Sequence, residues 1–375
     1  MDLDSIRNKI SSIDQDLVKI LNERAELSVI VGKTKKKSSD PSSSPSIYVP
    51  EQEKAVFNRV IGLNTGPLPN EAITSIYREI MSASISLQEN IQIGYLGPSG
   101  TFGHLAAKEK FGDSVSYIPC KTIKDVFSAV EKNQVDYGLV PIENSIFGCV
   151  VQTLDSFNSL ATSKSIIVIS EVYLPLQQTL LANCKLDKIK KIYSHPMAFG
   201  QAQEWLSNKL PNAQQIETNS TALGAQIAST EPYSAAIANS LCGAMYGLEI
   251  LEQDISSQAG NTTRFFVISQ EKKKPASKNP NKMLAMFTVD HRKAGALCLA
   301  LEVFNRKNIN LTAINSRPAL GFIADSSVSK NWHYMFFVEA IISDTNPNEI
   351  IDSVINELNS HCLYVKLLGM YPNSL

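Results

Sequence analysis

Two groups of side chains have types and spacings that could do chemistry. The first lies in AGNTTRF, residues 259–265, where an amide, two hydroxyls and a guanidinium at positions 261–264 stand directly before an apolar run. Chains enter strands through polar residues, but they rarely need four such groups in a row. Hydroxyls donate hydrogen bonds and a guanidinium holds carboxylates. The stretch is therefore either a turn or part of a site.

Four further polar clusters have the same character. They place Ser, Thr, Asn or Gly where a strand hands over to a turn or a helix, at 97–104, 141–148, 194–202 and 218–225. A single cluster of this kind is usually a helix cap or a turn. Five clusters over one segment are better explained as the walls of one cleft, because helix N-termini and hydroxyls suit carboxylate ligands.

The second group is a set of cations on an apolar helical stripe. Apolar residues recur every three or four positions over 3–31, which predicts one long amphipathic helix. The continued stripe reaches Arg24 and Lys35, and Arg7 lies on its flank. Charges on such a stripe are costly unless they are paired or bind a ligand. Either Arg24 meets a buried acid across a dimer and Lys35 lies beyond the helix, or the cations line a pocket for a small polyanion.

The elements that must position these groups divide the chain into three folded segments. Residues 1–90 read as all-α, with a Ser- and Pro-rich break at 35–46 and two further helices near 50–63 and 69–88. A first helix of about 33 residues is about 50 Å long. Two shorter helices can hardly cover it, so we expect a symmetric partner chain.

The rest of the chain reads as mixed structure. Residues 91–270 alternate strands and helices in two rounds, which predicts a two-lobed α/β domain with mostly parallel strands and a ligand at the strand ends. Residues 271–282 form a charged, Pro-containing linker. Residues 283–375 follow a βαββαβ pattern, which predicts a ferredoxin-like α+β domain. The expected fold class is therefore multidomain.

Composition argues against several other classes. The chain has 35 Lys+Arg against 36 Asp+Glu, so no basic nucleic-acid surface is indicated. The six cysteines form no C-x-x-C pair and do not cluster with the five histidines, which argues against structural zinc and a disulfide framework. No run approaches the ~18 apolar residues of a membrane span, and the N-terminus lacks a signal-peptide pattern. We expect a cytoplasmic protein with no metal, no cofactor, no nucleic acid and no membrane partner.

The helical segment resembles a known family. The stretch 3–35 resembles the first helix of the AroQ-type all-helical chorismate mutases, and 78–88 resembles their last helix. The resemblance implies cations facing the two carboxylates and ether oxygen of chorismate, an acid holding the substrate hydroxyl, and two residues that complete the pocket. These are Arg7 (from the partner chain), Arg24 and Lys35, then Glu53, then Ser84 and Gln88. Val49 and Gln52 stand where the family has an acid and an arginine.

The chemistry of that reaction agrees with such a pocket. A Claisen rearrangement needs no acid, base or metal, but it needs a compact conformer held by fixed charges and hydrogen-bond donors on the oxygen that gains negative charge. Gln88 is a neutral donor, so its contact would not depend on pH. The alternative, motivated by Val49 and Gln52, is a helical segment that serves mainly for dimerisation.

The middle segment resembles a second family. GNTTRF together with GLVPIENSIFGCVVQTLD resembles prephenate dehydratase across nearly the whole of 91–270. The essential threonine of that family corresponds to Thr263. The resemblance also implies a set of cleft-wall residues. They are Glu143, Asn144, Ser145, His195, Ser220, Thr221, Asn239, Arg264 and Phe265.

The implied reaction gives these residues roles. Prephenate loses carbon dioxide and its ring hydroxyl together, so Thr263 would donate a hydrogen bond to the leaving hydroxyl. Arg264 would fix a carboxylate. Glu143 would assist, or would be a structural partner for a nearby cation or backbone amide.

The last segment resembles the ACT regulatory domain attached to prephenate dehydratases. That family captures phenylalanine between the domains of a dimer, with a GAL turn and an E-S-R-P stretch in which Asn315 here replaces the glutamate. The implied regulatory residues are Gly295, Ala296, Leu297, Asn310, Leu311, Thr312, Ser316, Arg317 and Pro318. The alternative is that Arg317 and Pro318 merely end a strand.

The three resemblances together cover nearly the whole chain. They imply the family of bifunctional chorismate mutase/prephenate dehydratases, in which chorismate becomes prephenate and then phenylpyruvate. They further imply a homodimer or homotetramer that L-phenylalanine inhibits. A different reading is a non-catalytic sensor, because simple binding proteins also use two lobes with polar walls.

Overall fold

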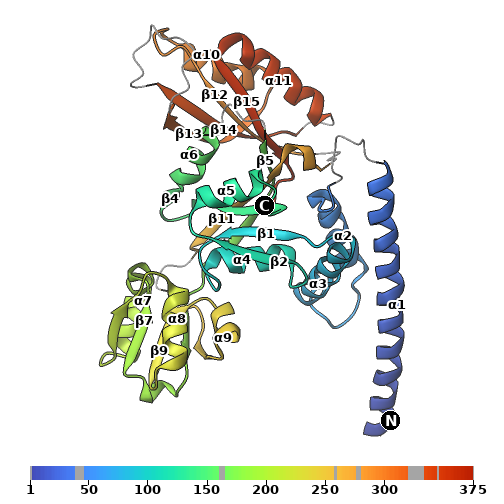
Figure 1. The fold of residues 1–375 in the computed structure, drawn as a ribbon, viewed down its shortest axis with the longest axis vertical. Helices are drawn as coiled ribbons and strands as arrows, with labels where there is room; N and C mark the ends of the chain where they lie inside the picture. The colour runs from blue at the N-terminus through green and yellow to red at the C-terminus, as the bar shows by residue number, and fades with distance from the viewer. Residues whose placement is uncertain are drawn as a thin grey trace.

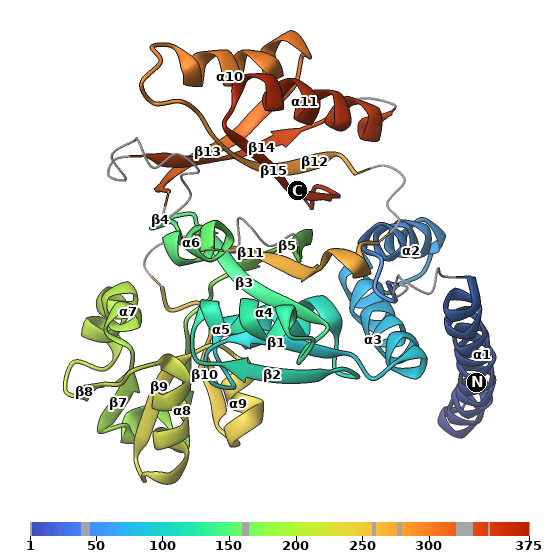
Figure 2. The ribbon, with the colours of Figure 1, turned by 45° about the horizontal axis from the view of Figure 1, so that its top comes forward.

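The computed structural model describes residues 2–38, 46–159, 165–256, 260–275, 280–319, 333–343 and 346–374. These residues form three parts (Figure 1): helices at the N-terminus, a two-lobed α/β part in the middle, and a C-terminal sheet with two helices. Figure 2 shows that the first lobe of the middle part lies between the N-terminal helices, the second lobe and the C-terminal sheet.

The N-terminal part is all-helical, as its periodicity predicts. Its helices are α1 Leu3–Ser38, α2 Pro50–Leu63 and α3 Asn70–Gln88. Pro50 occupies the first turn of α2, where its missing N–H costs nothing. The last turns of α1 pack closely on α3, because a Cβ at Gly32 would lie only 2.9 Å from Cγ of Gln88. Lys35 lies inside α1, so the alternative that it lies beyond the helix is wrong.

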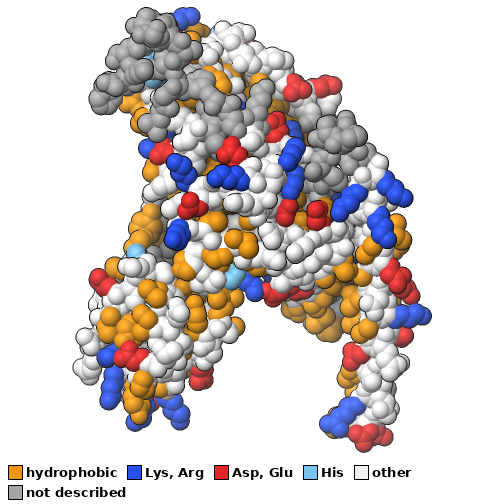
Figure 3. All heavy atoms as spheres, in the orientation of Figure 1, with side chains coloured by type: hydrophobic (Ala, Val, Ile, Leu, Met, Phe, Trp, Pro, Cys, Tyr) orange, Lys and Arg blue, Asp and Glu red, His pale blue; other side chains and the backbone are white. Residues whose placement is uncertain are grey.

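The N-terminal half of α1 projects away from the other elements (Figure 1). Its apolar stripe is exposed, and hydrophobic side chains are visible along α1 in Figure 3. The exposed residues include Leu3, Ile6, Ile10, Ile13, Leu17 and Ile20. Within the described chain nothing covers this stripe.

The first lobe is built on a mixed sheet. Its elements are β1 Gln92–Leu96, α4 Phe102–Phe111, β2 Ser116–Cys120, α5 Ile123–Glu131, β3 Tyr137–Asn144, β4 Gly148–Cys149, α6 Val151–Ser159, β5 Ile166–Pro175 and β11 Thr262–Gln270. The strand order is β5-β11-β3-β1-β2, with β4 paired to β3. Strand β11 is buried on both faces: Phe265 and Val267 pack with α4, and Phe266 and Ile268 pack with α5 and α6.

The second lobe has its own five-stranded sheet. Its elements are β6 Thr179–Ala182, η1 Leu186–Lys188, β7 Lys191–Ser194, α7 Pro196–Lys209, β8 Gln214–Glu217, α8 Thr221–Thr230, β9 Ser234–Ala238, α9 Leu241–Tyr246 and β10 Glu249–Glu252, with strand order β10-β6-β9-β7-β8. The chain crosses from β5 to β6 and returns from β10 to β11.

The expectation of mostly parallel strands is wrong. Strand β1 pairs in parallel with β2 and β3, and β7 pairs in parallel with β8 and β9. Within the middle part, the four strands at the crossings between the lobes (β5, β6, β10 and β11) pair antiparallel with their neighbours, since the chain leaves one sheet and later returns to it. The sequence pattern also missed α6, α9 and β10.

The C-terminal part follows the predicted βαββαβ order. Its elements are β12 Lys282–Thr288, α10 Ala296–Arg306, β13 Asn310–Pro318, β14 Tyr334–Ile341, α11 Pro347–His361 and β15 Tyr364–Tyr371, preceded by η2 Glu271–Lys273. Helices α10 and α11 pack on one face of the antiparallel sheet β13-β14-β12-β15, and the other face packs on the first lobe. Residues 276–279 of the predicted linker lie outside the described residues, and β12 begins at Lys282, the last linker position.

The C-terminal sheet and the first lobe share one continuous sheet, which the sequence pattern did not predict. Strand β15 pairs in parallel with β5 at Gly369 and Val168. A Cβ at Gly369 would lie 2.3 Å from the carbonyl oxygen of Val168, so only glycine permits this approach. No described helix is both long and apolar enough to span a membrane. The described residues also contain no group of three His, Cys, Asp or Glu that could hold a metal.

Candidate active site

The N-terminal helices bring several of the predicted pocket residues together. Nη1 of Arg24 on α1 donates to Oγ of Ser84 on α3 at 2.5 Å. One turn further along α3, Nε2 of Gln88 donates to the Ser84 carbonyl at 3.2 Å. Oε1 of Gln88 is buried and has no partner among the described residues. Lys35 donates to the carbonyls of residues 46 and 47 at 3.2 and 3.3 Å, and burial lowers its pKa.

Arg7 lies elsewhere in this chain. It sits on the projecting half of α1, with a 68% exposed side chain and an ion pair to Asp4 at 3.3 Å. Seventeen helical residues separate it from Arg24, which corresponds to about 25 Å along α1. A single chain therefore assembles the Arg24–Ser84 cluster without Arg7.

Glu53 contacts the middle part of the chain. Its carboxylate accepts a hydrogen bond from Oη of Tyr48 at 3.0 Å and pairs with Nζ of Lys110 on α4 at 2.6 Å. Tyr48 is buried against Phe111 and Tyr137, and its backbone N–H donates to Oη of Tyr137 at 3.3 Å. Burial, followed by the charge of Glu53, raises the pKa of Tyr48. The α/β part thus supplies the counter-charge of a residue predicted to bind substrate.

Thr263 lies at the junction of the two lobes, at the start of β11. Its Oγ1 accepts a hydrogen bond from Nδ2 of Asn144 at 3.0 Å. The Asn144 amide is oriented without ambiguity, because its Oδ1 accepts from the backbone N–H groups of Ile146 and Phe147, both at 3.0 Å. Its Nδ2 also donates to Oδ1 of Asn261 at 2.7 Å. A hydroxyl that accepts from an amide keeps its own proton free for another partner.

Ser145 forms hydrogen bonds with the segment that leads into β11. Its Oγ donates to the carbonyl of Gly260 at 3.0 Å and accepts from the backbone N–H of Thr262 at 2.9 Å. Its own backbone N–H donates to the Thr262 carbonyl at 2.9 Å. Two backbone segments therefore hold Thr263 in register beside Asn144.

The second lobe carries the other predicted hydroxyl and amide residues. His195 and Ser220 are the N-caps of α7 and α8, where they accept from backbone N–H groups at 3.2 and 3.1 Å, and Thr221 begins α8. Asn239 joins the lobes directly, because its Nδ2 donates to the carbonyl of Gly100 at 2.7 Å. Oδ1 of Asn239 is buried with no partner in the described part of the chain.

Three buried amide residues were not among the predicted site residues. Asn261 is 4% exposed, and its Nδ2 has no partner among the described residues. Gln178 donates to Gln201 at 2.9 Å, and Oε1 of Gln178 is likewise unpartnered. Asn261 and Gln201 both lie inside the polar clusters quoted above, so treating every amide in those clusters as a candidate would have found two of the three.

The structure contradicts the predicted role of Arg264 and favours the structural-partner alternative for Glu143. Consecutive residues of a strand face opposite sides of the sheet, so Arg264 points away from the side that holds Thr263. Its guanidinium binds Glu339 of β14 with two hydrogen bonds at 2.8 and 2.6 Å, so the expectation that it fixes a substrate carboxylate is wrong for this geometry. Glu143 lies on the same face, 3.8 Å from Arg264, as a structural partner of that cation. Phe265 is buried in the core of the first lobe and does not line a wall.

The predicted regulatory residues lie at the start of α10 and at the two ends of β13. Gly295 caps α10 with φ of 77°, a left-handed conformation that favours glycine, and Ala296 and Leu297 open the helix. Asn310, Leu311 and Thr312 begin β13, and Ser316, Arg317 and Pro318 end it. The strand end is attached to α6, because Arg317 binds Asp155 at 2.7 and 2.9 Å and the Pro318 carbonyl accepts from Asn158 at 2.7 Å.

Comparison with known proteins assigns the two catalytic parts. Residues 6–89 match the family chorismate mutase type II, and residues 93–273 match the family prephenate dehydratase. The bifunctional chorismate mutase/prephenate dehydratase of Aquifex aeolicus (strain VF5) is 39% identical over 379 residues, covering 100% of this chain and 99% of that protein.

Two solved structures have a similar fold. The prephenate dehydratase of Arthrobacter aurescens in complex with L-Phe has a TM-score of 0.63 and 30% identity, covering 76% of this chain and 90% of that chain. The prephenate dehydratase of Staphylococcus aureus subsp. aureus Mu50 has a TM-score of 0.60 and 29% identity, covering 75% and 100%.

The fold and the match to prephenate dehydratase therefore define an enzyme of the dehydratase class with a helical part before it. The helical part is a catalytic domain type in its own right, since it matches a mutase family over nearly its whole length. Because the similarity to the Aquifex protein runs from end to end, this chain belongs to the family of bifunctional chorismate mutase/prephenate dehydratases.

Proposed function

We propose that this chain rearranges chorismate to prephenate in its helical part and converts prephenate to phenylpyruvate at the junction of the two lobes. The observation that carries the proposal is the Thr263 hydroxyl, which accepts from Asn144 and so presents its proton toward a ligand. The full-length similarity to bifunctional relatives supports the pairing of the two reactions in one chain.

The mutase site is proposed around the contact of α1 with α3. Arg24 and Lys35 hold the two carboxylates and the ether oxygen of a compact chorismate conformer, and Gln88 donates to the oxygen that gains charge. Ser84 orients Arg24 through its 2.5 Å hydrogen bond. Glu53, held by Lys110, accepts from the substrate hydroxyl. Two half-buried cations, Arg24 and Lys35, beside a neutral amide favour a pocket over the alternative of a helical segment that only dimerises.

The dehydratase step is proposed at Thr263. The ring of prephenate becomes aromatic as the bond to its carboxylate carbon breaks, carbon dioxide leaves, and the C–O bond of the ring hydroxyl breaks. The Thr263 hydroxyl donates a hydrogen bond to that departing oxygen, while Asn144 and Asn261 keep the donor aimed. A threonine is a weak acid, so the proton that turns hydroxide into water comes through a further donor or a water relay. Glu143 is not that donor, because it faces the other side of the sheet.

The C-terminal part is proposed as a ferredoxin-like ACT domain that binds L-phenylalanine. Its strand order β13-β14-β12-β15 with both helices on one face supports this assignment. The Arthrobacter relative is a prephenate dehydratase in complex with L-Phe. The proposed domain bounds are 1–90, 91–270 and 283–375. Phenylalanine bound near Gly295 and Ser316–Pro318 lowers activity by favouring a less active state.

A homodimer or homotetramer is proposed as the working assembly. The exposed apolar stripe of α1 supports it, because a second copy of the helix would cover the stripe and bring Arg7 to the pocket of the other chain. A cytoplasmic location is proposed as well, where the six cysteines stay reduced.

One assay tests both activities. Purified full-length protein is incubated with chorismate, and phenylpyruvate is followed by its absorbance in base. The Thr263→Ala variant is expected to lose about 10²- to 10⁴-fold in dehydratase turnover while its mutase turnover stays at the wild-type level. Equal dehydratase activity in that variant would reject Thr263, and wild-type protein that consumes no chorismate would reject the mutase assignment.

A further inference from the structure

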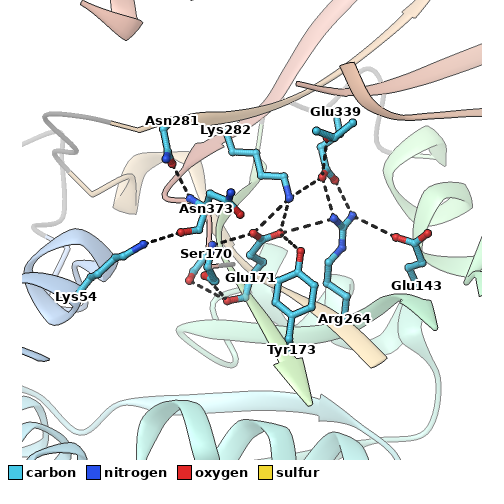
Figure 4. Close-up of polar contacts among 12 residues, drawn as sticks. Lys54, Glu143, Ser170, Glu171, Tyr173, Arg264, Asn281, Lys282, Glu339 and Asn373 are labelled. Atoms are coloured by element: carbon cyan, nitrogen blue, oxygen red, sulfur yellow. Dashed lines mark hydrogen bonds and ion pairs between the residues drawn. The ribbon is translucent and has the colours of Figure 1, made fainter. Parts of the chain in front are cut away.

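Four buried charges connect the dehydratase strands to the C-terminal sheet (Figure 4). Arg264 of β11 binds Glu339 of β14 through both guanidinium nitrogens, at 2.8 and 2.6 Å. Lys282 of β12 bonds to Glu171 of β5 at 3.0 Å and to Glu339 at 2.8 Å. Each domain thus contributes one cation and one carboxylate, and two of the ion pairs cross between the domains.

The group is neutral overall and nearly closed to solvent. The side chains of Glu171, Glu339, Lys282 and Arg264 are 0%, 3%, 4% and 11% exposed. Burial would raise the pKa of Glu339, but its hydrogen bond and charge interaction with Arg264, together with Lys282, outweigh burial and lower that pKa. Each of the two carboxylates lies within 3.0 Å of a buried cation. Removing one partner leaves an uncompensated buried charge, which is strongly unfavourable.

Further contacts hold Arg264 and the two carboxylates in place. Its guanidinium lies 5.2 Å from the ring centroid of Phe266, two residues along the same strand. Tyr173 donates to Glu171 at 3.4 Å, and Thr312 donates to Glu339 at 3.5 Å. These contacts hold Arg264 and the two carboxylates in place, so the position of β14 bears on the position of β11.

Thr263 immediately precedes Arg264 in the strand. The two side chains face opposite sides of the sheet, so Arg264 clamps the back of the strand whose front presents the Thr263 hydroxyl. The pairing of β11 with β3 shifts register between Arg264 and Phe265, where β3 carries one extra residue, Ile142. On its other side, β11 pairs with β5 without a shift from Thr262 to Val267.

We propose that Glu339 is a positioning residue of the dehydratase site, acting through Arg264 to hold β11 so that the Thr263 hydroxyl points at the departing oxygen. The inference rests on the proposed dehydratase function. It gives the C-terminal domain a part in the reaction itself, besides any binding of an effector. A displacement of about 1 Å at a reacting group can lower a rate by about 100-fold, so a loosened clamp is sufficient for a large effect.

The test compares Glu339→Gln with Glu357→Gln in the full-length protein. Glu357 is a matched control, because it lies in the same domain and pairs with Arg306 and Lys307 at 2.5 and 3.2 Å without facing β11. Glu339→Gln is expected to lower dehydratase kcat by about 10- to 100-fold, with KM for prephenate changed less than about threefold and mutase kcat unchanged. Glu357→Gln is expected to keep both activities.

A second variant separates positioning from simple stabilisation. Arg264→Met/Glu339→Met removes both charges and leaves the Lys282–Glu171 pair balanced, so the fold is retained. If the Arg264–Glu339 pair positions β11, this double variant unfolds at the same urea concentration as the wild type, but its dehydratase kcat stays as low as that of Glu339→Gln. Wild-type dehydratase kcat in the stable double variant overturns the inference, as does a kcat for Glu339→Gln equal to that of Glu357→Gln. Absence of dehydratase activity in the wild-type protein would instead overturn the proposed function.

Discussion

Replacing Lys110 by Met is expected to loosen the N-terminal helices from the α/β part. The side chains of Lys110 and Glu53 are only 19% and 13% exposed, so the change leaves a carboxylate buried without its counter-charge. Breaking a buried pair in this way costs about 3–5 kcal/mol. The hydroxyl of Tyr48 still donates to Glu53 at 3.0 Å, which places the loss near the lower end, at about 3 kcal/mol.

Lys108 provides the control on the same helix. It also forms an ion pair, with Asp113, but the two side chains are 30% and 64% exposed. Exposed pairs contribute about 1 kcal/mol at most, so Lys108→Met should change little. The expected contrast comes from burial alone, since both changes remove a lysine charge from α4.

Amide hydrogen exchange in α2 measures the contrast directly. A loss of about 3 kcal/mol in local stability corresponds to about 100-fold faster exchange in residues 50–63 of Lys110→Met. Lys108→Met should exchange at nearly the wild-type rate. Equal exchange in the two variants would refute the reasoning. Loss of the Lys110–Glu53 ion pair should also lower mutase kcat/KM. For the same reason, residues 1–90 alone should be a weaker mutase than the full chain.

Three other substitutions test the packing between β15 and β5, the packing of α7, and the ionisation of a buried histidine in the first lobe. Gly369→Ala should destabilise the joint between the two domains by about 1–3 kcal/mol or more in urea unfolding, because its Cβ would meet the backbone of β5 at 2.3 Å. Gly200→Ala, in a helix with nothing within 4 Å, should stabilise by about 0.5 kcal/mol instead. His104 is buried and accepts from the backbone N–H of Gly100 at 3.1 Å, and burial followed by the charge of Lys108 lowers its pKa. Below pH 6.5, the ordinary pKa of histidine, residue His104 therefore binds more protons in the unfolded chain than in the folded one. The free energy of unfolding should fall as pH drops through 6.5, and His104→Gln should reduce that slope.

Local sequence patterns predicted the helices of the N-terminal part and the order of elements in the C-terminal part. The predicted helices at 50–63 and 69–88 agree with α2 and α3 to within one residue at each end, because each has an amphipathic stripe bounded by Pro, Asn or Ser. The βαββαβ order of the C-terminal part was also predicted. The direction of the strands in the middle part was predicted wrongly, because the antiparallel pairs at the crossings join segments far apart in the chain.

The site was predictable only in part, for the same reason. The polar clusters indicated a site at the strand ends, and the family resemblance singled out Thr263 and Asn144, which the structure places within hydrogen-bond distance of each other. The role of Arg264 was missed because its partner Glu339 is 75 residues away, in a different domain. One local rule would have helped: neighbours in a strand face opposite sides, so Thr263 and Arg264 could not both line one wall.

The first lobe contacts both the helical part and the C-terminal sheet, which explains how the three parts can work as one enzyme. Its helix α4 begins beside the loop that meets the second lobe and ends at Lys110, which holds Glu53 of the helical part. Its strand β11 carries Thr263 on one side and meets the C-terminal sheet through Arg264 on the other. A change in the C-terminal sheet can therefore reach β11 through the buried Arg264–Glu339 ion pair, whereas the C-terminal part meets the helical part through an exposed hydrogen bond, from Nζ of Lys54 to the Asn373 carbonyl at 2.9 Å. An effector bound to the C-terminal domain should accordingly act on the dehydratase reaction first and on the mutase reaction weakly.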